Sequence, residues 1–133
     1  MKTIIYLLLL LPFMGCKKDD DSSKNQLRGI WLLKKSIYSS GGLPTIVNAD
    51  PNRPVQLTLR KDGTFSINTE PYLSPLQRYL REFDYYQVFP NNELHFKNRT
   101  TGEEIVFQIE LGEELELSRF CREACSDYFV RSY

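Results

Sequence analysis

Three cysteines and one histidine are the residues whose chemistry stands out in this sequence. Cys121 and Cys125 are separated by three residues, whereas redox-active pairs usually have two residues between their cysteines. No histidine or methionine lies close to them in the sequence to complete a soft-metal site. In an exported protein, such a pair is typical of a structural disulfide. We therefore predict that a Cys121–Cys125 disulfide closes the last hairpin of the fold.

The other titratable residues show no catalytic pattern. His95 alternates with Glu93 and Lys97 on the polar side of an expected strand, so we predict a surface histidine rather than a catalytic base. The glutamates between residues 103 and 116 lack the spacing of a calcium-binding loop. No serine, cysteine or carboxylate has a sequence context that would activate it. We expect no metal, no cofactor and no enzymatic activity.

The charge balance argues against a nucleic-acid partner. The chain has 133 residues, with 17 Lys+Arg and 17 Asp+Glu. A near-neutral protein has no long-range field that would attract DNA, RNA or anionic lipid. The length suggests a single domain.

Residues 1–15 are predicted to be a signal peptide. Lys2 supplies a positive charge, and an apolar run of eleven residues follows from Ile4 to Met14, broken only by Pro12. A helix needs about 20 apolar residues to cross a bilayer, so this run is too short to span one. A short apolar run behind a basic start and before a small residue is typical of a secretory signal.

The stretch Phe13–Cys16 resembles the lipobox of bacterial lipoproteins, in which a small residue precedes the cysteine that receives lipid. Gly15 and Cys16 fit that pattern, whereas Phe13 and Met14 depart from it. The resemblance implies cleavage before Cys16 and acylation of Cys16, with palmitate among the expected acyl chains. Several acyl chains on one residue give stable membrane anchoring. The alternative is an ordinary signal peptide that happens to contain a cysteine.

Residues 16–26 are predicted to be the lipidated cysteine and a disordered tether. The stretch 17–24 has no apolar residue and cannot bury enough surface to fold. It resembles the Lys-plus-acidic export signal of Bacteroidetes-type surface lipoproteins. That resemblance implies an outer-membrane location, on the cell surface or on the periplasmic face.

Residues 27–133 are predicted to form one all-β domain. Short segments alternate apolar and polar residues and are separated by turn residues such as Asp62-Gly63. A short helix is expected over 75–82, where Ser74, Pro75 and Gln77 form a capping box, and it would plug one end of the barrel. This helix lies between the third and fourth strands of an eight-stranded antiparallel up-and-down meander that closes into a barrel. The expected strands are residues 29–38, 55–60, 65–67, 83–89, 93–97, 104–111, 115–117 and 127–133.

The domain is similar to the lipocalin-like lipoproteins of Bacteroidetes-type bacteria. The matching residues are Gly29-Ile30-Trp31, Lys61-Asp62-Gly63-Thr64-Phe65, and Leu115-x-Leu117 followed by Tyr128-x-x-Arg131. The resemblance implies a lipocalin-like barrel whose base is closed by Arg131 lying over Trp31.

Strand parity leads to the same pair at the barrel base. If Cys121 pairs directly with Cys125, then Leu117 lies opposite Phe129 and Leu115 opposite Arg131, all facing inward. A buried cation needs a partner or an aromatic ring, so the Arg131 guanidinium should lie within about 6 Å of the Trp31 ring. The alternative is a turn longer by one residue, which would place Tyr128 and Val130 inward and turn Arg131 out to solvent.

Two functions remain open for an anchored barrel without catalytic residues. The first is a non-enzymatic binding or accessory role, with a small apolar or sugar-like molecule as the candidate ligand. An aromatic group that would line its pocket comprises Tyr72, Tyr79, Phe83, Tyr85, Tyr86 and Phe89. The same residues could instead fill the core. The alternative is a structural lipoprotein that partners other envelope proteins through its outer strands and has no ligand cavity.

Overall fold

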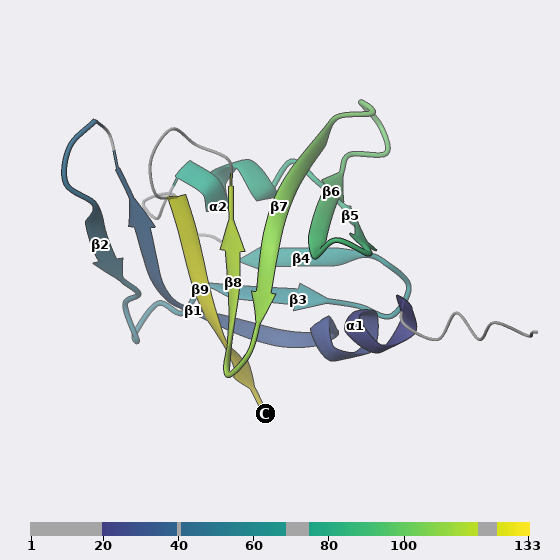
Figure 1. Ribbon diagram of the computed structural model, residues 1–133, viewed down its shortest axis with the longest axis horizontal. Coiled ribbons are helices and arrows are strands. Elements are labelled where there is room, and N and C mark those ends of the chain that lie inside the picture. The colour runs from purple at the N-terminus through teal and green to yellow at the C-terminus, as the bar shows by residue number, and fades with distance from the viewer. Residues whose placement is uncertain (1–19, 40, 69–74, 120–124) are drawn as a thin grey trace, which may run out of the picture.

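The computed structural model describes residues 20–39, 41–68, 75–119 and 125–133 (Figure 1). Helix α1 covers Asp20–Leu27, and helix α2 covers Pro75–Leu80. The strands are β1 (Gly29–Tyr38), β2 (Thr45–Asn48), β3 (Gln56–Leu59), β4 (Phe65–Asn68), β5 (Tyr85–Phe89), β6 (Glu93–Lys97), β7 (Glu104–Leu111), β8 (Glu114–Ser118) and β9 (Cys125–Ser132).

Eight of the strands form a nearly closed antiparallel barrel, as the sequence predicted. The order β4-β3-β1-β9-β8-β7-β6-β5 places strands that follow one another in the chain side by side, apart from β2. The first strand, β1, also pairs with the last, β9. A bridge between Thr64 and Tyr85 brings β4 and β5 together, and Tyr86 N donates to Gly63 O at 2.7 Å. Closure of this kind leaves few open strand edges.

Strand β2 lies in the segment 39–54, which the sequence analysis treated as a connection between strands. It pairs with the second half of β1, whereas β3 pairs with the first half of the same edge. All four residues of β2 are exposed. Because no residue of β2 is buried, its sequence lacks the alternation that marks the other strands.

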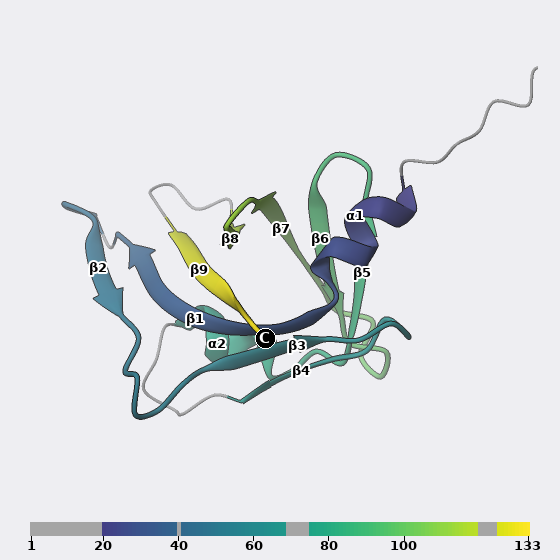
Figure 2. The same ribbon diagram turned by 90° about the horizontal axis from the view of Figure 1, so that it is seen from below.

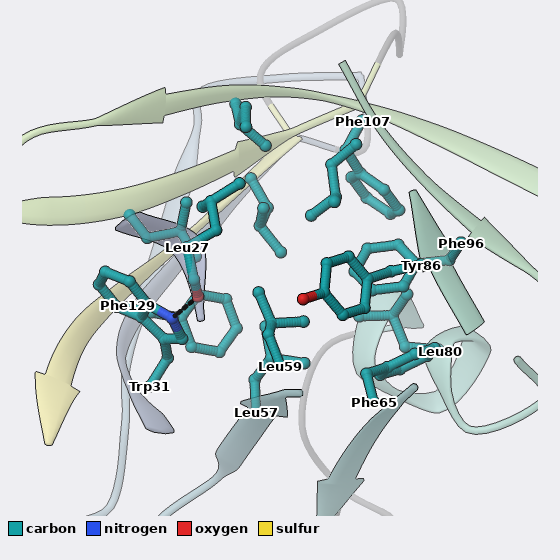
Figure 3. Close-up of a cluster of buried hydrophobic side chains, with 14 of the residues drawn as sticks. Leu27, Trp31, Leu57, Leu59, Phe65, Leu80, Tyr86, Phe96, Phe107 and Phe129 are labelled. Atoms are coloured by element: carbon teal, nitrogen blue, oxygen red, sulfur yellow. Dashed lines mark hydrogen bonds between the residues drawn. The ribbon is translucent and has the colours of Figure 1, made fainter. Parts of the chain in front are cut away.

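The inward side chains of the barrel form one hydrophobic cluster (Figure 3). The alternation of β7 is confirmed, since Ile105, Phe107 and Ile109 are buried. Aromatic rings pack edge to face inside the hydrophobic cluster, and the Phe96 and Phe107 ring centroids are 5.5 Å apart. The largest fully buried side chains are Trp31, Phe96, Phe107, Phe129, Leu27, Leu57, Leu59, Leu80, Leu94, Leu115 and Leu117.

Helix α2 lies between β4 and β5, close to the predicted position. It ends at Leu80, two residues before the predicted end at 82. Leu80 is buried in the core cluster, so the last turn of α2 contributes to the barrel interior.

The structure shows which face of β5 points into the barrel. Tyr86 is the buried residue, while Tyr85 is half-buried and Gln87 is exposed. The bond from Tyr86 N to Gly63 O fixes β5 against the preceding turn in this orientation. Both tyrosines have an apolar ring and a polar tip, so their sequence pattern fits either orientation.

The pairing of β8 with β9 differs by two residues from the predicted register. Leu115 lies opposite Phe129 rather than Arg131, and Leu117 opposite Asp127. Arg119 N donates to Cys125 O at 3.0 Å, so the connection between the strands is longer than the assumed three-residue turn. A shift of two residues preserves the faces. Leu115, Leu117 and Phe129 are therefore fully buried, as predicted.

Helix α1 overturns the prediction of a disordered tether for the part of 16–26 that the structure describes. The segment from Asp20 is helical, whereas residues 16–19 lie outside the described part of the chain. Leu27, the last residue of α1, is fully buried in the core cluster. The stretch 17–24 has no apolar residue, and the helix is held through contacts at its C-terminal end.

Gly63 is the glycine at which a side chain would collide most severely. It lies in the turn between β3 and β4 with φ +83°, and a Cβ there would meet the Tyr85 ring at 2.4 Å. Gly102 has a similar φ of +76°, but nothing lies within 4 Å of its Cβ position. An alanine at Gly102 would therefore cost only backbone strain, whereas an alanine at Gly63 would cost backbone strain and a steric collision.

We predict that Gly102→Ala lowers the free energy of unfolding by about 1–2 kcal/mol through backbone strain alone. Gly63→Ala should cost about 2–4 kcal/mol, because the Tyr85 ring must also move. Urea denaturation of the two variants measures both values. Equal losses would contradict the close packing of Tyr85 on Gly63.

Candidate binding surfaces

The predicted contact at the barrel base is present. Trp31 and Arg131 are opposite each other in the pairing of β1 with β9. The Arg131 guanidinium lies 4.8 Å from the centre of the Trp31 ring. A planar cation over an aromatic face is attracted by the ring's electron density.

Both side chains also bind the end of α1. The Trp31 indole Nε1 donates to Leu27 O at 2.8 Å (Figure 3), and the Arg131 guanidinium donates to Gln26 O. The last carbonyls of a helix have no partner within the helix, so these two donors satisfy groups that would otherwise need water. We call Gln26, Leu27, Trp31 and Arg131 the base cluster.

A hollow of about 500 Å³ lies beside the base cluster and is called the base hollow here. Trp31, Arg131, Tyr133 and the Leu111-Gly112 turn contribute to its lining. The polar side chains in the lining are Asn25, Gln26 and Arg131, and the apolar or aromatic ones are Trp31, Leu111 and Tyr133. Because Trp31 is buried and Tyr133 is fully exposed, the hollow is not enclosed by the mostly apolar wall expected of a small-ligand pocket.

The aromatic group considered for a ligand pocket is divided between the core and the outside. Phe83 and Tyr86 are buried members of the core cluster. Tyr79 is 46% exposed, and the Phe89 ring packs outside against His95 with centroids 4.1 Å apart. Tyr72 lies outside the described residues. For Phe83 and Tyr86 the structure favours the core interpretation.

His95 is less solvated than the sequence suggested. Its side chain is only 14% exposed and lies between two carboxylates, Glu93 at 3.1 Å and Glu104. The hydrogen bond from His95 holds the pKa of Glu104 below its ordinary value. This cluster lies on the outer face of β6 and β7 and has no cavity among the hollows built from described residues. Within the ranges that the structure describes, no group of three or more His, Cys, Asp or Glu is placed to hold a metal ion.

A second hollow, of about 370 Å³, is lined by residues of α1, the β3–β4 turn and β5. Three cations, Lys24, Arg28 and Lys61, contribute to its lining, and we call it the cationic hollow. The sequence analysis missed it because Lys24 was assigned to a tether. A Lys and an Arg four residues apart, as Lys24 and Arg28 are, would share one face of a helix and were the available signal.

The hairpin formed by the second half of β1 and by β2 carries exposed apolar side chains. Leu43 is 92% exposed, Ile46 is 60% and Val47 is 37%. Pairing places Ile46 opposite Ile37 on one face and Val47 opposite Ser36 on the other, so both faces carry apolar groups. The hairpin projects from the barrel at the end opposite α1 (Figures 1 and 2). The uncharged, β-branched run Thr45-Ile46-Val47 was its only sequence signal.

The structure describes one of the three cysteines, Cys125. Cys125 is disulfide-bonded. The predicted partner Cys121 and the predicted lipidation site Cys16 both lie outside the described residues.

No protein-family model matches this sequence, and no curated protein or solved structure is significantly similar to it. The resemblance to lipocalin-like lipoproteins therefore rests on the residues quoted above. Among the described residues, no helix is long and apolar enough to cross a membrane.

We predict that Arg131→Met lowers the free energy of unfolding by about 1.5–3 kcal/mol, because it keeps the apolar stem but removes the cation and its donors. Arg119→Met is the matched control. Its guanidinium lies 5.5 Å from the exposed Tyr79 ring, and we expect a change within about 0.5 kcal/mol. Thermal or urea unfolding compares the two variants. Losses of equal size would contradict the importance of the base cluster.

Proposed function

We propose that this protein is a lipid-anchored protein of the bacterial outer membrane. Its barrel would be a non-enzymatic accessory module that binds a partner protein through the β1–β2 hairpin. The anchor is supported by the signal-like residues 1–15 and by the Gly15-Cys16 pair. Several acyl chains on Cys16 would hold the protein on the membrane stably.

The packing of the barrel favours a partner protein over a small ligand. Large side chains such as Trp31, Phe96 and Phe107 are fully buried in one cluster. An eight-stranded barrel is narrow enough for its own side chains to fill it. The two hollows described above lie at the edge of that cluster, beside α1. The base hollow has a mixed lining, and the lining of the cationic hollow is mostly polar or charged.

The exposed apolar side chains of the β1–β2 hairpin are the observation that carries this proposal. Proteins usually protect an edge strand with charges, proline or a covering element. Strand β2 carries no charge, and in the described part of the chain it pairs with β1 alone. Exposed apolar groups beside an open edge are suited to a partner that adds an extended strand.

The partner that fits this edge is an extended, mostly uncharged segment of another envelope protein. Its main chain would bond to the open side of β2, and its apolar side chains would cover Ile46 and Val47. Burial of such β-branched side chains contributes about 1.5–3 kcal/mol each.

Cys16→Ser should release the protein from the membrane fraction or leave an uncleaved precursor, since a hydroxyl cannot carry the thioether-linked lipid. Cell fractionation and immunoblotting measure this. Cys125→Ser is the control for loss of a cysteine and should stay membrane-bound. A processed Cys16→Ser protein that remains in the membrane fraction would contradict the anchor.

A photo-crosslinking residue placed at Ile46 should form one discrete adduct of higher mass in living cells. The control position is Glu110, which is exposed on β7 in the wall of the barrel away from β2. It should form no such adduct. Adducts of equal yield at both positions, or none at Ile46, would contradict docking on the hairpin. An adduct whose mass equals two copies of this chain would indicate self-association instead.

A further inference from the structure

The cationic hollow has an excess of positive charge. Lys24, Arg28 and Lys61 face one carboxylate, that of Asp62. None of the three cations forms a salt bridge with a carboxylate among the described residues. Lys34, Lys97 and Arg99 on the barrel are each paired with a carboxylate, whereas these three cations line one common hollow.

Asp62 is occupied by its own turn. Its carboxylate accepts bonds from the Thr64 hydroxyl at 2.7 Å and from the Thr64 backbone N–H at 2.9 Å. These bonds hold the pKa of Asp62 below its ordinary value. The carboxylate is thus fixed toward Thr64 and offsets only part of the positive charge.

The wall of the hollow is shaped by tyrosines on β5. The Tyr85 ring lies directly on Gly63, and the Tyr86 hydroxyl donates to Arg60 O at 2.6 Å. Burial raises the pKa of Tyr86, and the nearby Arg28 cation opposes that shift. Arg28 lines the hollow, and its guanidinium also donates to the side-chain oxygen of Asn25.

The position of the hollow in the chain indicates what could occupy it. Helix α1 starts at Asp20, four positions after Cys16, and an extended chain of four residue steps reaches at most about 14 Å. Lys24 is one helical turn further, about 6 Å. A lipid on Cys16 therefore keeps Lys24 within about 20 Å of the anchor, whatever path the chain takes.

We propose that the cationic hollow seats the phosphate-bearing headgroup of an anionic lipid in the membrane that holds the anchor. This inference rests on the proposed acylation of Cys16. Lysine and arginine near an anionic membrane surface are attracted to it, and Arg binds phosphate through two parallel donors. With α1 on the membrane, the β1–β2 hairpin points away from it, because the two lie at opposite ends of the molecule (Figures 1 and 2).

The test measures amine labelling of the acylated full-length mature protein, purified from membranes and reconstituted in vesicles. One set of vesicles contains phosphatidylcholine alone, and the other also contains phosphatidylglycerol. Lys34 is the internal reference, since its side chain is 54% exposed and it lies six residues beyond Arg28 along β1. We expect phosphatidylglycerol to slow the labelling of Lys24 and Lys61 by about fivefold, while Lys34 is unchanged.

Two variants test whether the slower labelling of Lys24 and Lys61 depends on the cationic hollow. Arg28→Gln should remove most of the protection of Lys24 and Lys61. Arg119→Gln removes an exposed guanidinium at the far end of β8 and should leave the protection intact.

Three results would overturn the proposal. Equal labelling of Lys24 and Lys61 in both vesicle types, with the protein still floating with the vesicles, would exclude headgroup binding but leave the anchor intact. Protection that extends equally to Lys34 would indicate a general attraction to the surface. Protection by inorganic phosphate in detergent, without vesicles, would indicate a soluble phosphate ligand instead. Failure of the protein to float would instead contradict the acylated anchor.

Discussion

The Arg131 guanidinium lies over the Trp31 ring, and both side chains donate to the last carbonyls of α1. Each of these groups has a requirement that the others meet. The buried indole needs an acceptor, the helix end needs donors, and the cation is attracted to the aromatic face. Because Trp31 is on the first strand and Arg131 on the last, the same contacts lie at the seam where the barrel closes.

Strand β1 connects the two ends of the molecule. It begins at the base cluster and ends in the projecting hairpin, and its ten residues span about 33 Å. Its first half is covered by β3, and its second half pairs with β2. Helix α1 and the β1–β2 hairpin lie at opposite ends of the molecule (Figure 1). The base cluster and the cationic hollow both include residues of α1, so they lie at the end away from the exposed apolar hairpin. In the proposed function, the first end faces the membrane and the second end faces the partner.

The sequence predicted the parts of the fold that have one buried and one exposed face. Strand β7 is the clearest case, since every second residue from Ile105 to Ile109 is buried. Strand β2 was missed because it buries nothing, and a strand without a buried face has no period to detect. The β8–β9 register was wrong by two residues because it depends on the length of the connection between them. The prediction of which β8 and β9 residues face inward was correct, because a shift of two residues in the pairing keeps each side chain on the same face.

Helix α1 could not be predicted from its own residues. A helix of eight residues is marginal in water, and among its side chains that the structure describes only that of Leu27, at the last position, is buried. The donor that binds its end, Arg131, is 105 residues away from Gln26 in the sequence. The cationic hollow depends on the same helix, so it too was beyond local sequence patterns. By contrast, the Trp31–Arg131 contact followed from strand parity and from the resemblance, without knowledge of the helix.

Native-state hydrogen exchange of α1 tests most directly whether the base cluster joins this helix to the barrel. The backbone amides of residues 24–27 in the last turn of α1 are the ones to follow. If the account is correct, they exchange only on openings whose free energy approaches that of the central strands β1 and β9. Exchange of these amides at the rate of an unstructured peptide, while β1 and β9 stay protected, would contradict it.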